Sequence, residues 1–157
     1  MANRNRRLGD SARRITDELG KGQEVLRKAS ATFRCINVAK TEWATILVPD
    51  VGIKVVDISV TSNVIMAGSD ANTLDVYKRS GGSDVELITQ FDPDQVVAKT
   101  PSFRTLLAAA SSVAGGEHIS ARLVQAATTG GVAATPSDIT VEVSYILSDD
   151  ERTYTVG

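Results

Sequence analysis

Residues 138–147, DITVEVSYIL, carry the clearest strand signature of the chain. Apolar and polar side chains alternate along this stretch, and a period of two is typical of a β-strand with one buried face. Its β-branched content also favours a strand. We therefore predict that one face of this strand lies in a hydrophobic core. The side chains expected on that face are Ile139, Val141, Val143 and Tyr145.

Outward from this stretch, segments of the same kind fill most of the chain from residue 29 onward. They are short, rich in β-branched residues and separated by turn-forming sequences. Together they make about seven or eight strands, with turn signals roughly every 8–12 residues, which indicates an antiparallel β-sandwich or barrel. The strand–helix alternation of a parallel sheet is absent from the sequence. The other strand segments lie near residues 30–39, 42–49, 52–66, 72–79, 85–91 and 118–128.

Strict alternation along residues 53–60 would divide that strand between two faces. One face would carry Lys54, Val56, Ile58 and Val60, and the other Ile53, Val55, Asp57 and Ser59. Residues 103–113, FRTLLAAASSV, leave two interpretations open. Their Ala and Leu content favours a helix, whereas their position between strands favours an irregular strand.

The charge of the chain is divided unevenly. Residues 1–28 hold eight Lys/Arg against four Asp/Glu, whereas the rest of the chain is acidic, and the whole chain has a formal net charge of −2. Asp10 and Ser11 favour a helix start, and Ile15 and Leu19 follow at helical spacing. We therefore predict a basic amphipathic N-terminal arm with a short helix at residues 1–28, a β-sandwich at 29–148 and a tail at 149–157.

The arm is the predicted partner-binding segment. Its apolar stripe is too narrow to stabilise a helix alone, so we expect it to bind a partner. Basic side chains suit an acidic protein surface or a phosphate backbone. The arm holds no aromatic residue for base stacking, which favours the protein surface; a disordered solubilising tail is the remaining alternative. The predicted binding residues are Arg4, Arg6, Arg7, Arg13, Arg14, Ile15 and Leu19.

The sequence offers little for catalysis. His118 and Cys35 are single, so the usual zinc ligand sets cannot form; we expect a surface or edge histidine and a buried cysteine. No nucleophile elbow, phosphate-binding loop or membrane-spanning run is present. We expect no catalytic residue, no metal and no cofactor, and hence no enzyme. Acidic loop residues suit solvation better than a calcium site: Asp70, Asp75, Asp84, Asp92, Asp94, Asp149, Asp150 and Glu151.

Two further features have structural explanations. The glycine pairs 81–82, 115–116 and 130–131 are best explained by turns that need positive φ. Trp43, the single tryptophan, is predicted to fill the core or the space between the sheets, with a sugar-stacking platform as the alternative.

The order of segments resembles a class of small phage virion proteins. The resemblance covers residues 41–147 and is carried by WATILVPDVGIKVVDISV (43–60), NTLDVYKRSGGSDVELITQF (72–91), GEHISARLVQAATTGG (116–131) and ITVEVSYI (139–146). These segments are similar to those of jelly-roll decoration (cement) proteins and head-fibre proteins of tailed bacteriophages. The resemblance carries over no catalytic residue.

The resemblance implies a jelly-roll β-sandwich on the virion surface, added to the capsid in the host cytoplasm. Such a protein would clamp neighbouring copies of the major capsid protein and associate with itself as a dimer or trimer. It would need no membrane, no nucleic acid and no small-molecule substrate. The alternatives are a phage tail, neck or fibre-anchoring protein, and a carbohydrate- or receptor-binding module.

Overall fold

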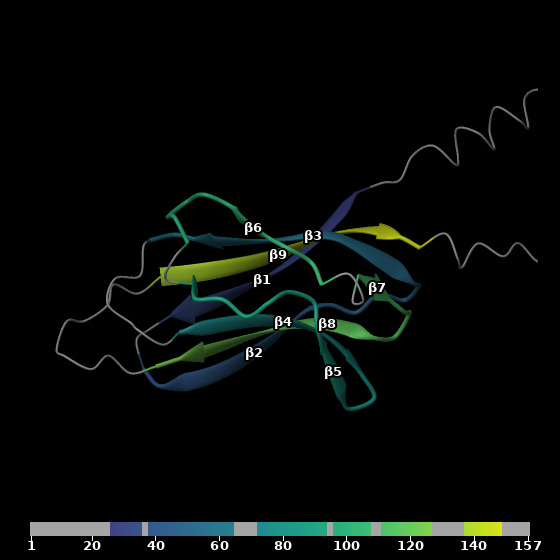
Figure 1. The fold of residues 1–157 in the computed structure, drawn as a ribbon, viewed down its shortest axis with the longest axis horizontal. Helices are drawn as coiled ribbons and strands as arrows, with labels where there is room; N and C mark the ends of the chain where they lie inside the picture. Colours follow the sequence, from purple (N-terminus) through teal and green to yellow (C-terminus); the bar gives the residue numbers. More distant parts are fainter. Residues whose placement is uncertain are drawn as a thin grey trace, which may run out of the picture.

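The computed structural model describes residues 26–35, 38–64, 72–93, 96–107, 111–126 and 137–148. These residues form nine strands in two antiparallel sheets that pack face to face, as Figure 1 shows. The predicted mainly-β class and β-sandwich are therefore confirmed. The described residues contain no helix, and the helix predicted in the N-terminal arm lies outside them.

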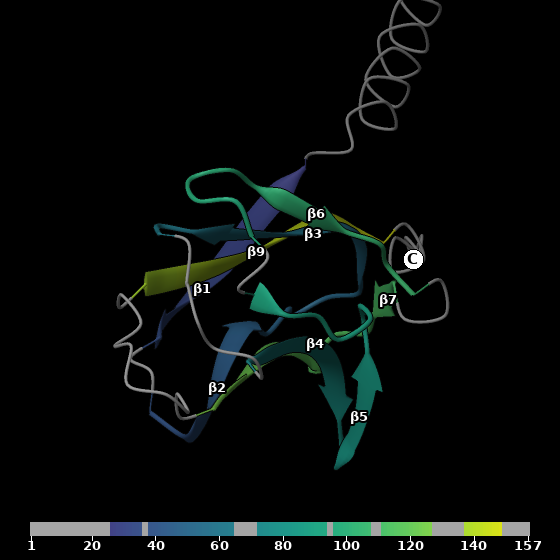
Figure 2. The same ribbon diagram turned by 60° about the vertical axis from the view of Figure 1, so that its left-hand side comes forward.

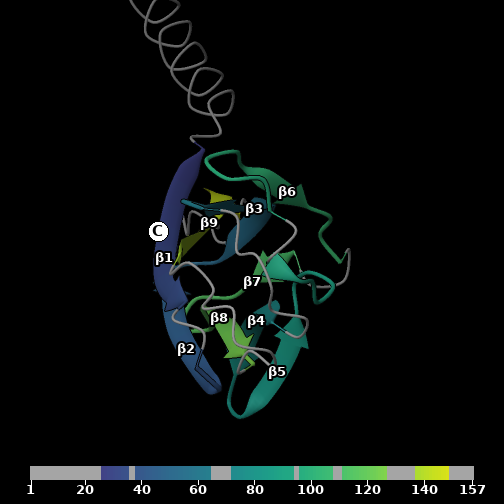
Figure 3. The same ribbon diagram turned by 90° about the vertical axis from the view of Figure 1, so that its left-hand side faces the viewer.

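The two layers have different strand content. Sheet A has the order β1 (Arg27–Cys35), β9 (Ser137–Leu147), β3 (Ile53–Ser62) and β6 (Ser102–Arg104), with β7 (Ser112–Val113) paired to the start of β3. Sheet B has the order β2 (Lys40–Leu47), β8 (His118–Gln125), β4 (Thr73–Ser80) and β5 (Ser83–Glu86). Figure 3 views the two layers from one side, with β1 and β2 along one edge and β6 and β5 along the other.

The pairing of the strands is nested. β4 pairs with β5, β3 with β6, β2 with β8 and β1 with β9, so the chain resembles one long hairpin rolled over into two sheets. This nesting of two Greek keys is the strand order of a jelly roll. β9, which contains the stretch 138–147, lies between β1 and β3 at the centre of sheet A.

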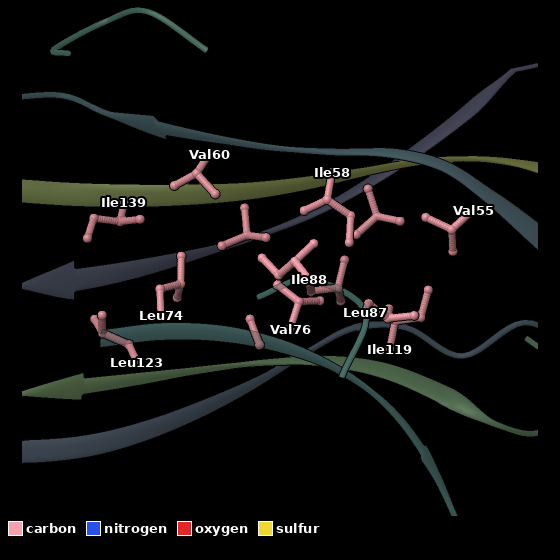
Figure 4. Packing of buried hydrophobic residues seen from close by; sticks show 14 of the residues in the cluster. Val55, Ile58, Val60, Leu74, Val76, Leu87, Ile88, Ile119, Leu123 and Ile139 are labelled. Atoms are coloured by element: carbon pink, nitrogen blue, oxygen red, sulfur yellow. The ribbon is translucent and has the colours of Figure 1, made fainter. Parts of the chain in front are cut away.

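The core lies between the sheets and is almost entirely aliphatic. Figure 4 shows Ile58, Val60 and Ile139 of sheet A facing Leu74, Val76 and Leu123 of sheet B. The face predicted for residues 138–147 is confirmed, because Ile139, Val141 and Val143 are buried and Tyr145 packs against the core. Phe33 is the one phenylalanine among the buried core residues that the structure describes. The low aromatic content of the chain is therefore reflected in a core built mainly from Val, Ile and Leu.

The alternation predicted for residues 53–60 is wrong. Ile53 and Val55 are buried, and so are Ile58 and Val60, although strict alternation would separate the two pairs. The register explains the difference: Val55 pairs with Tyr145 and Asp57 with Ser144, so Val56 is an extra residue with no partner of its own on β9. Such a β-bulge moves the side chains that follow it to the other face. Val56 itself is exposed.

Residues 103–113 are extended where the structure describes them. Ser102–Arg104 is β6, Leu106 pairs with Ile88, and Ser112–Val113 is β7. The strand interpretation is therefore confirmed for these parts. After β6 the chain no longer pairs with β3. Leu106 and Leu107 pair instead with Ile88 and Leu87, which follow β5, and this contact connects the β6 edge of sheet A with the β5 edge of sheet B.

The predicted glycine turn at 81–82 is also confirmed. Gly81 and Gly82 have φ of +55° and +97° and join β4 to β5, with Ser80 paired to Ser83. Figure 2 shows this hairpin at the lower rim of sheet B. A two-residue hairpin loop with positive φ at both positions favours glycine, because a side chain there crowds the backbone.

This geometry predicts the effect of substitutions in the turn. Gly82→Val is expected to lower the free energy of unfolding by about 1–2 kcal/mol because a β-branched residue is strained at positive φ. Gly81→Asn should cost much less, since asparagine tolerates this region. Urea unfolding of the two variants measures the difference. Equal losses would contradict the turn assignment.

Candidate interaction surface

The described residues do not include the predicted binding residues of the arm. Arg4, Arg6, Arg7, Arg13, Arg14, Ile15 and Leu19 all lie outside them, so the arm assignment stays a prediction. The first described residue, Leu26, is exposed and leads directly into β1 at the edge of sheet A. Residues 27 and 28, the last two of the predicted arm, are the first two of β1.

The outer face of sheet B carries an unusual set of side chains. Trp43 on β2 pairs with Arg122 on β8, which pairs with Asp75 on β4, so one row crosses three strands. Tyr77 and Arg79 follow Asp75 on the same face of β4, because side chains at i, i+2 and i+4 share a face. We call these five residues, Trp43, Asp75, Tyr77, Arg79 and Arg122, the aromatic–arginine cluster.

Trp43 is held by its neighbours and remains accessible. Its ring centroid is 5.6 Å from that of Tyr77, with the planes tilted by 39°. The Cζ atom of Arg79 lies 4.5 Å from the ring centroid, and that of Arg122 lies 5.5 Å from it. Both guanidinium groups are within the range of cation–π attraction. Trp43 is 40% exposed, so the cluster presents an indole to solvent in a fixed position.

Asp75 is the buried member of the cluster and accepts hydrogen bonds from its neighbours. Its Oδ2 atom accepts hydrogen bonds from Nε and Nη2 of Arg122, at 3.1 and 2.7 Å, and from Nε2 of Gln90 at 3.2 Å. The Asp75 side chain is 1% exposed. A buried carboxylate requires such partners, because an unpaired charge away from water is strongly unfavourable. The hydrogen bond to Asp75 also raises the pKa of Arg122, which keeps this guanidinium charged.

Two further interactions complete the cluster. Arg79 donates from Nε to Oδ1 of Asp84 at 2.7 Å, across the β4–β5 pair. Burial raises the pKa of the Tyr77 phenol, and the negative charge of Asp75 raises it further. Tyr77 is therefore neutral at physiological pH, and its ring packs against Trp43 and Arg122.

Two predictions from the sequence are wrong at this surface. Trp43 does not fill the core; its position on β2 places it on the outer face, opposite to Ile46. Asp75 is not a solvated loop residue but is fully buried in the middle of β4. Arg122 and Gln90 cover Asp75, and Trp43 packs against Arg79 and Arg122 on the outer face.

Sequence reasoning also did not single out Tyr77, Arg79 and Arg122. A signal was present in the spacing, because Asp75, Tyr77 and Arg79 occupy every second position of a strand whose alternate positions begin with the apolar residues Leu74 and Val76. An Arg and a Tyr on the solvent face of one strand are ordinary, and only the pairing with Trp43 from β2 gives them a common environment.

The single histidine and cysteine do not join this cluster. His118 is the half-buried first residue of β8, which lies between β2 and β4 in sheet B. Cys35 is the last residue of β1 and pairs with Ser137. Asp84 is exposed, as predicted, and pairs with Arg79.

Among the described residues, no group of three or more His, Cys, Asp or Glu is placed to hold a metal ion. No helix in the described part has the length and apolarity to cross a bilayer.

The outer face of sheet A has a different character. Lys28 pairs with Glu142 at 2.7 Å, and the hydroxyls of Thr32 and Thr140 are 3.0 Å apart, so these polar groups pair with one another. At its edge Phe103 on β6 is 69% exposed. Phe103 is therefore a second accessible aromatic residue, on the opposite layer from Trp43.

The fold and these faces define a jelly-roll β-sandwich with a preorganised aromatic–arginine surface on one layer. No known protein family and no protein of curated function matches the chain by sequence. Among the solved structures that are similar in fold are two phage capsids. A chain in the capsid asymmetric unit of cyanophage Pam1 matches with a TM-score of 0.52 at 16% identity, over 78% of this chain and 85% of that one.

The second similar structure is the acid-stable capsid of the Helicobacter pylori bacteriophage KHP30. One of its chains matches with a TM-score of 0.50 at 13% identity, over 78% of this chain and 88% of that one. At such low identities the likeness concerns the fold. The shared part includes most of the β-sandwich, because it covers over three quarters of the chain.

Proposed function

We propose that the chain is a virion structural protein that decorates the outer shell of a phage capsid and clamps neighbouring major capsid protein subunits. The observation that carries the proposal is the jelly-roll β-sandwich, which two chains from phage capsid structures share over 78% of this chain. A clamping protein needs a stable body and a surface for its neighbours. The aliphatic core supplies the first, and the outer face of sheet B supplies the second.

The basic N-terminal arm has a defined place in this proposal. It joins the body at the free edge of sheet A, beside the exposed residues Leu26, Arg27 and Lys28. A segment that leaves a sandwich at its rim can extend over an adjacent subunit without disturbing the core. The clamp would then have two contacts, the arm and the body, and two linked contacts bind more tightly than either alone.

Deleting the arm tests this function. Because β1 begins at Arg27, the deletion should remove residues 1–25 and leave the strand intact. We expect the shortened chain to keep its β-sheet circular dichroism and to bind empty capsids of the parent phage at least about tenfold more weakly, a loss of about 1.4 kcal/mol or more. The measurement is occupancy of purified shells by cosedimentation. Unchanged occupancy would contradict the role of the arm.

Copy number separates a decoration protein from a tail, neck or fibre-anchoring protein. A decoration protein repeats with the shell lattice, whereas a neck or tail component follows the symmetry of one vertex. Quantitative gel densitometry of purified virions measures this ratio. We expect hundreds of copies in each particle, and six or twelve copies would favour the tail or neck.

A further inference from the structure

The aromatic–arginine cluster has the composition of a binding hot spot. Trp, Tyr and Arg dominate the energetics of protein interfaces, and here one Trp, one Tyr and two Arg are in mutual contact on a sheet face. The described strands of sheet A carry no such group on their outer face. There Lys28 pairs with Glu142, and the hydroxyl of Thr32 pairs with that of Thr140. The two layers therefore differ in what they can bind.

The cluster is already ordered before any partner arrives. Trp43 lies against two guanidinium groups, and each guanidinium is fixed by a carboxylate, Arg79 by Asp84 and Arg122 by Asp75. Fixing a long side chain on binding costs about 0.5–1.5 kcal/mol. The buried pair with Asp75 offsets that cost for Arg122, so contacts that a partner makes with this guanidinium contribute more fully to affinity.

The cluster still has hydrogen-bond donors to offer. A guanidinium has five N–H donors in a planar fork. Among the described residues Arg79 donates from Nε to Asp84, and Arg122 donates from Nε and Nη2 to Asp75. The other N–H groups belong to guanidinium groups that lie over the exposed indole of Trp43. Carboxylates are the preferred acceptors for such donors, because they bind guanidinium in charge-assisted pairs.

Other classes of ligand fit this surface less well. A phosphate backbone presents a row of negative charges, and because Asp75 and Asp84 balance the two arginines, the cluster lacks the excess positive charge that such a row needs. A single carboxylate needs only the remaining N–H groups of a guanidinium. A sugar ring would have to share the indole with two guanidinium groups that already lie over it. A protein surface with a carboxylate beside an apolar contact uses both the donors and the indole edge.

We propose that this cluster is the docking site for a carboxylate-bearing surface of a neighbouring protein subunit in the particle. The inference rests on the proposed decoration function and deepens it by assigning the outer face of sheet B as the contact of the body. The indole fills an apolar depression on the partner, and the free N–H groups of Arg79 and Arg122 bind its carboxylate. The arm and the cluster then form the two contacts of the clamp.

The test compares two exposed aromatic residues on opposite layers. Trp43→Ala should weaken binding of the full chain to empty capsids of the parent phage by about 30-fold or more, the size expected for a hot spot. Phe103→Ala, the matched control on β6, should change the dissociation constant by less than about twofold. Trp43→Phe should restore most of the affinity, because it keeps an aromatic ring. Circular dichroism checks that each variant is folded.

A second comparison tests the carboxylate. Arg79→Gln should weaken binding by about tenfold, and raising the salt concentration should weaken the wild-type chain but affect this variant less, since salt screens the charge pair. Equal salt dependence of the two proteins would overturn the carboxylate part of the proposal.

The outcomes separate this inference from the proposed function. If the wild-type chain does not bind the shells, the decoration function fails. If it binds and Trp43→Ala binds equally well, the function stands and the docking site is wrong. Trp43 is the only tryptophan, so its fluorescence reports on the cluster alone. Quenching by soluble glycans, together with unchanged shell binding by Trp43→Ala, would replace the protein partner with a saccharide.

Discussion

Replacing Asp75 with alanine should lower the free energy of unfolding by about 2–4 kcal/mol. Removing one member of a buried ion pair typically costs about 3–5 kcal/mol because the other charge is left unpaired. The expected value here is smaller, since the Arg122 side chain is 31% exposed and water can solvate it in part. Gln90 would lose an acceptor as well. Urea unfolding followed by circular dichroism measures the loss.

The matched control is Asp84→Ala. The Arg79–Asp84 pair has the same 2.7 Å separation as the Arg122–Asp75 pair, but both of its side chains are 37% exposed. Exposed pairs contribute about 0–1 kcal/mol, so this variant should lose less than about 1 kcal/mol. Because the two pairs have the same separation, the comparison measures the effect of burying the carboxylate. Similar losses in the two variants would show that Asp75 is not desolvated as the structure indicates.

These two aspartates also show what the sequence could not reveal. Both stand near turn-forming sequences, and a carboxylate near a turn is usually solvated. Asp84 follows this rule. Asp75 departs from it because Arg122 and Gln90, which lie 47 and 15 residues away along the chain, fold over it. Side-chain cover of this kind depends on the pairing of β4 with β8, and the sequence of β4 holds no information about its neighbour.

The sandwich itself was predictable for a physical reason. Apolar side chains occupy every second position from Ile119 to Leu123 in β8 and from Ile139 to Leu147 in β9, so the period of two specifies the buried face. The Gly81–Gly82 turn was predictable in the same way, because few residues adopt positive φ at two successive positions. Both features depend on residues that are close together in the sequence.

Trp43 shows the limit of arguments from residue type. A single tryptophan in a chain with few aromatic residues is expected in the core, where it would bury the most apolar area. The register instead places it on the outer face of β2, and cation–π contacts with Arg79 and Arg122 take the place of core packing. The candidate surface therefore became visible only when three strands distant in sequence were brought side by side.

The bulge in β3 makes a prediction that strict alternation would not make. Deleting Val56 removes the unpaired residue and leaves Ile53, Val55, Ile58 and Val60 on the core face of a regular strand. We expect this variant to fold, with a loss of about 1–2 kcal/mol from the altered strand twist. Deleting Ser59 keeps the bulge. It also reverses the inward and outward positions of the residues after Ile58 relative to those before Ser59.

The Ser59 deletion should be far more damaging. Either Val60 turns outward and the Ser62–Ser137 hydrogen bond is lost, or Ile53, Val55 and Ile58 turn outward. Each buried aliphatic side chain contributes about 1.5–3 kcal/mol, and domains of this size are stable by only about 5–15 kcal/mol. We therefore expect no cooperative urea transition for this variant and a clear one for the Val56 deletion. Since both remove one residue from the same strand, an equal effect would mean that the bulge does not set the register of β3.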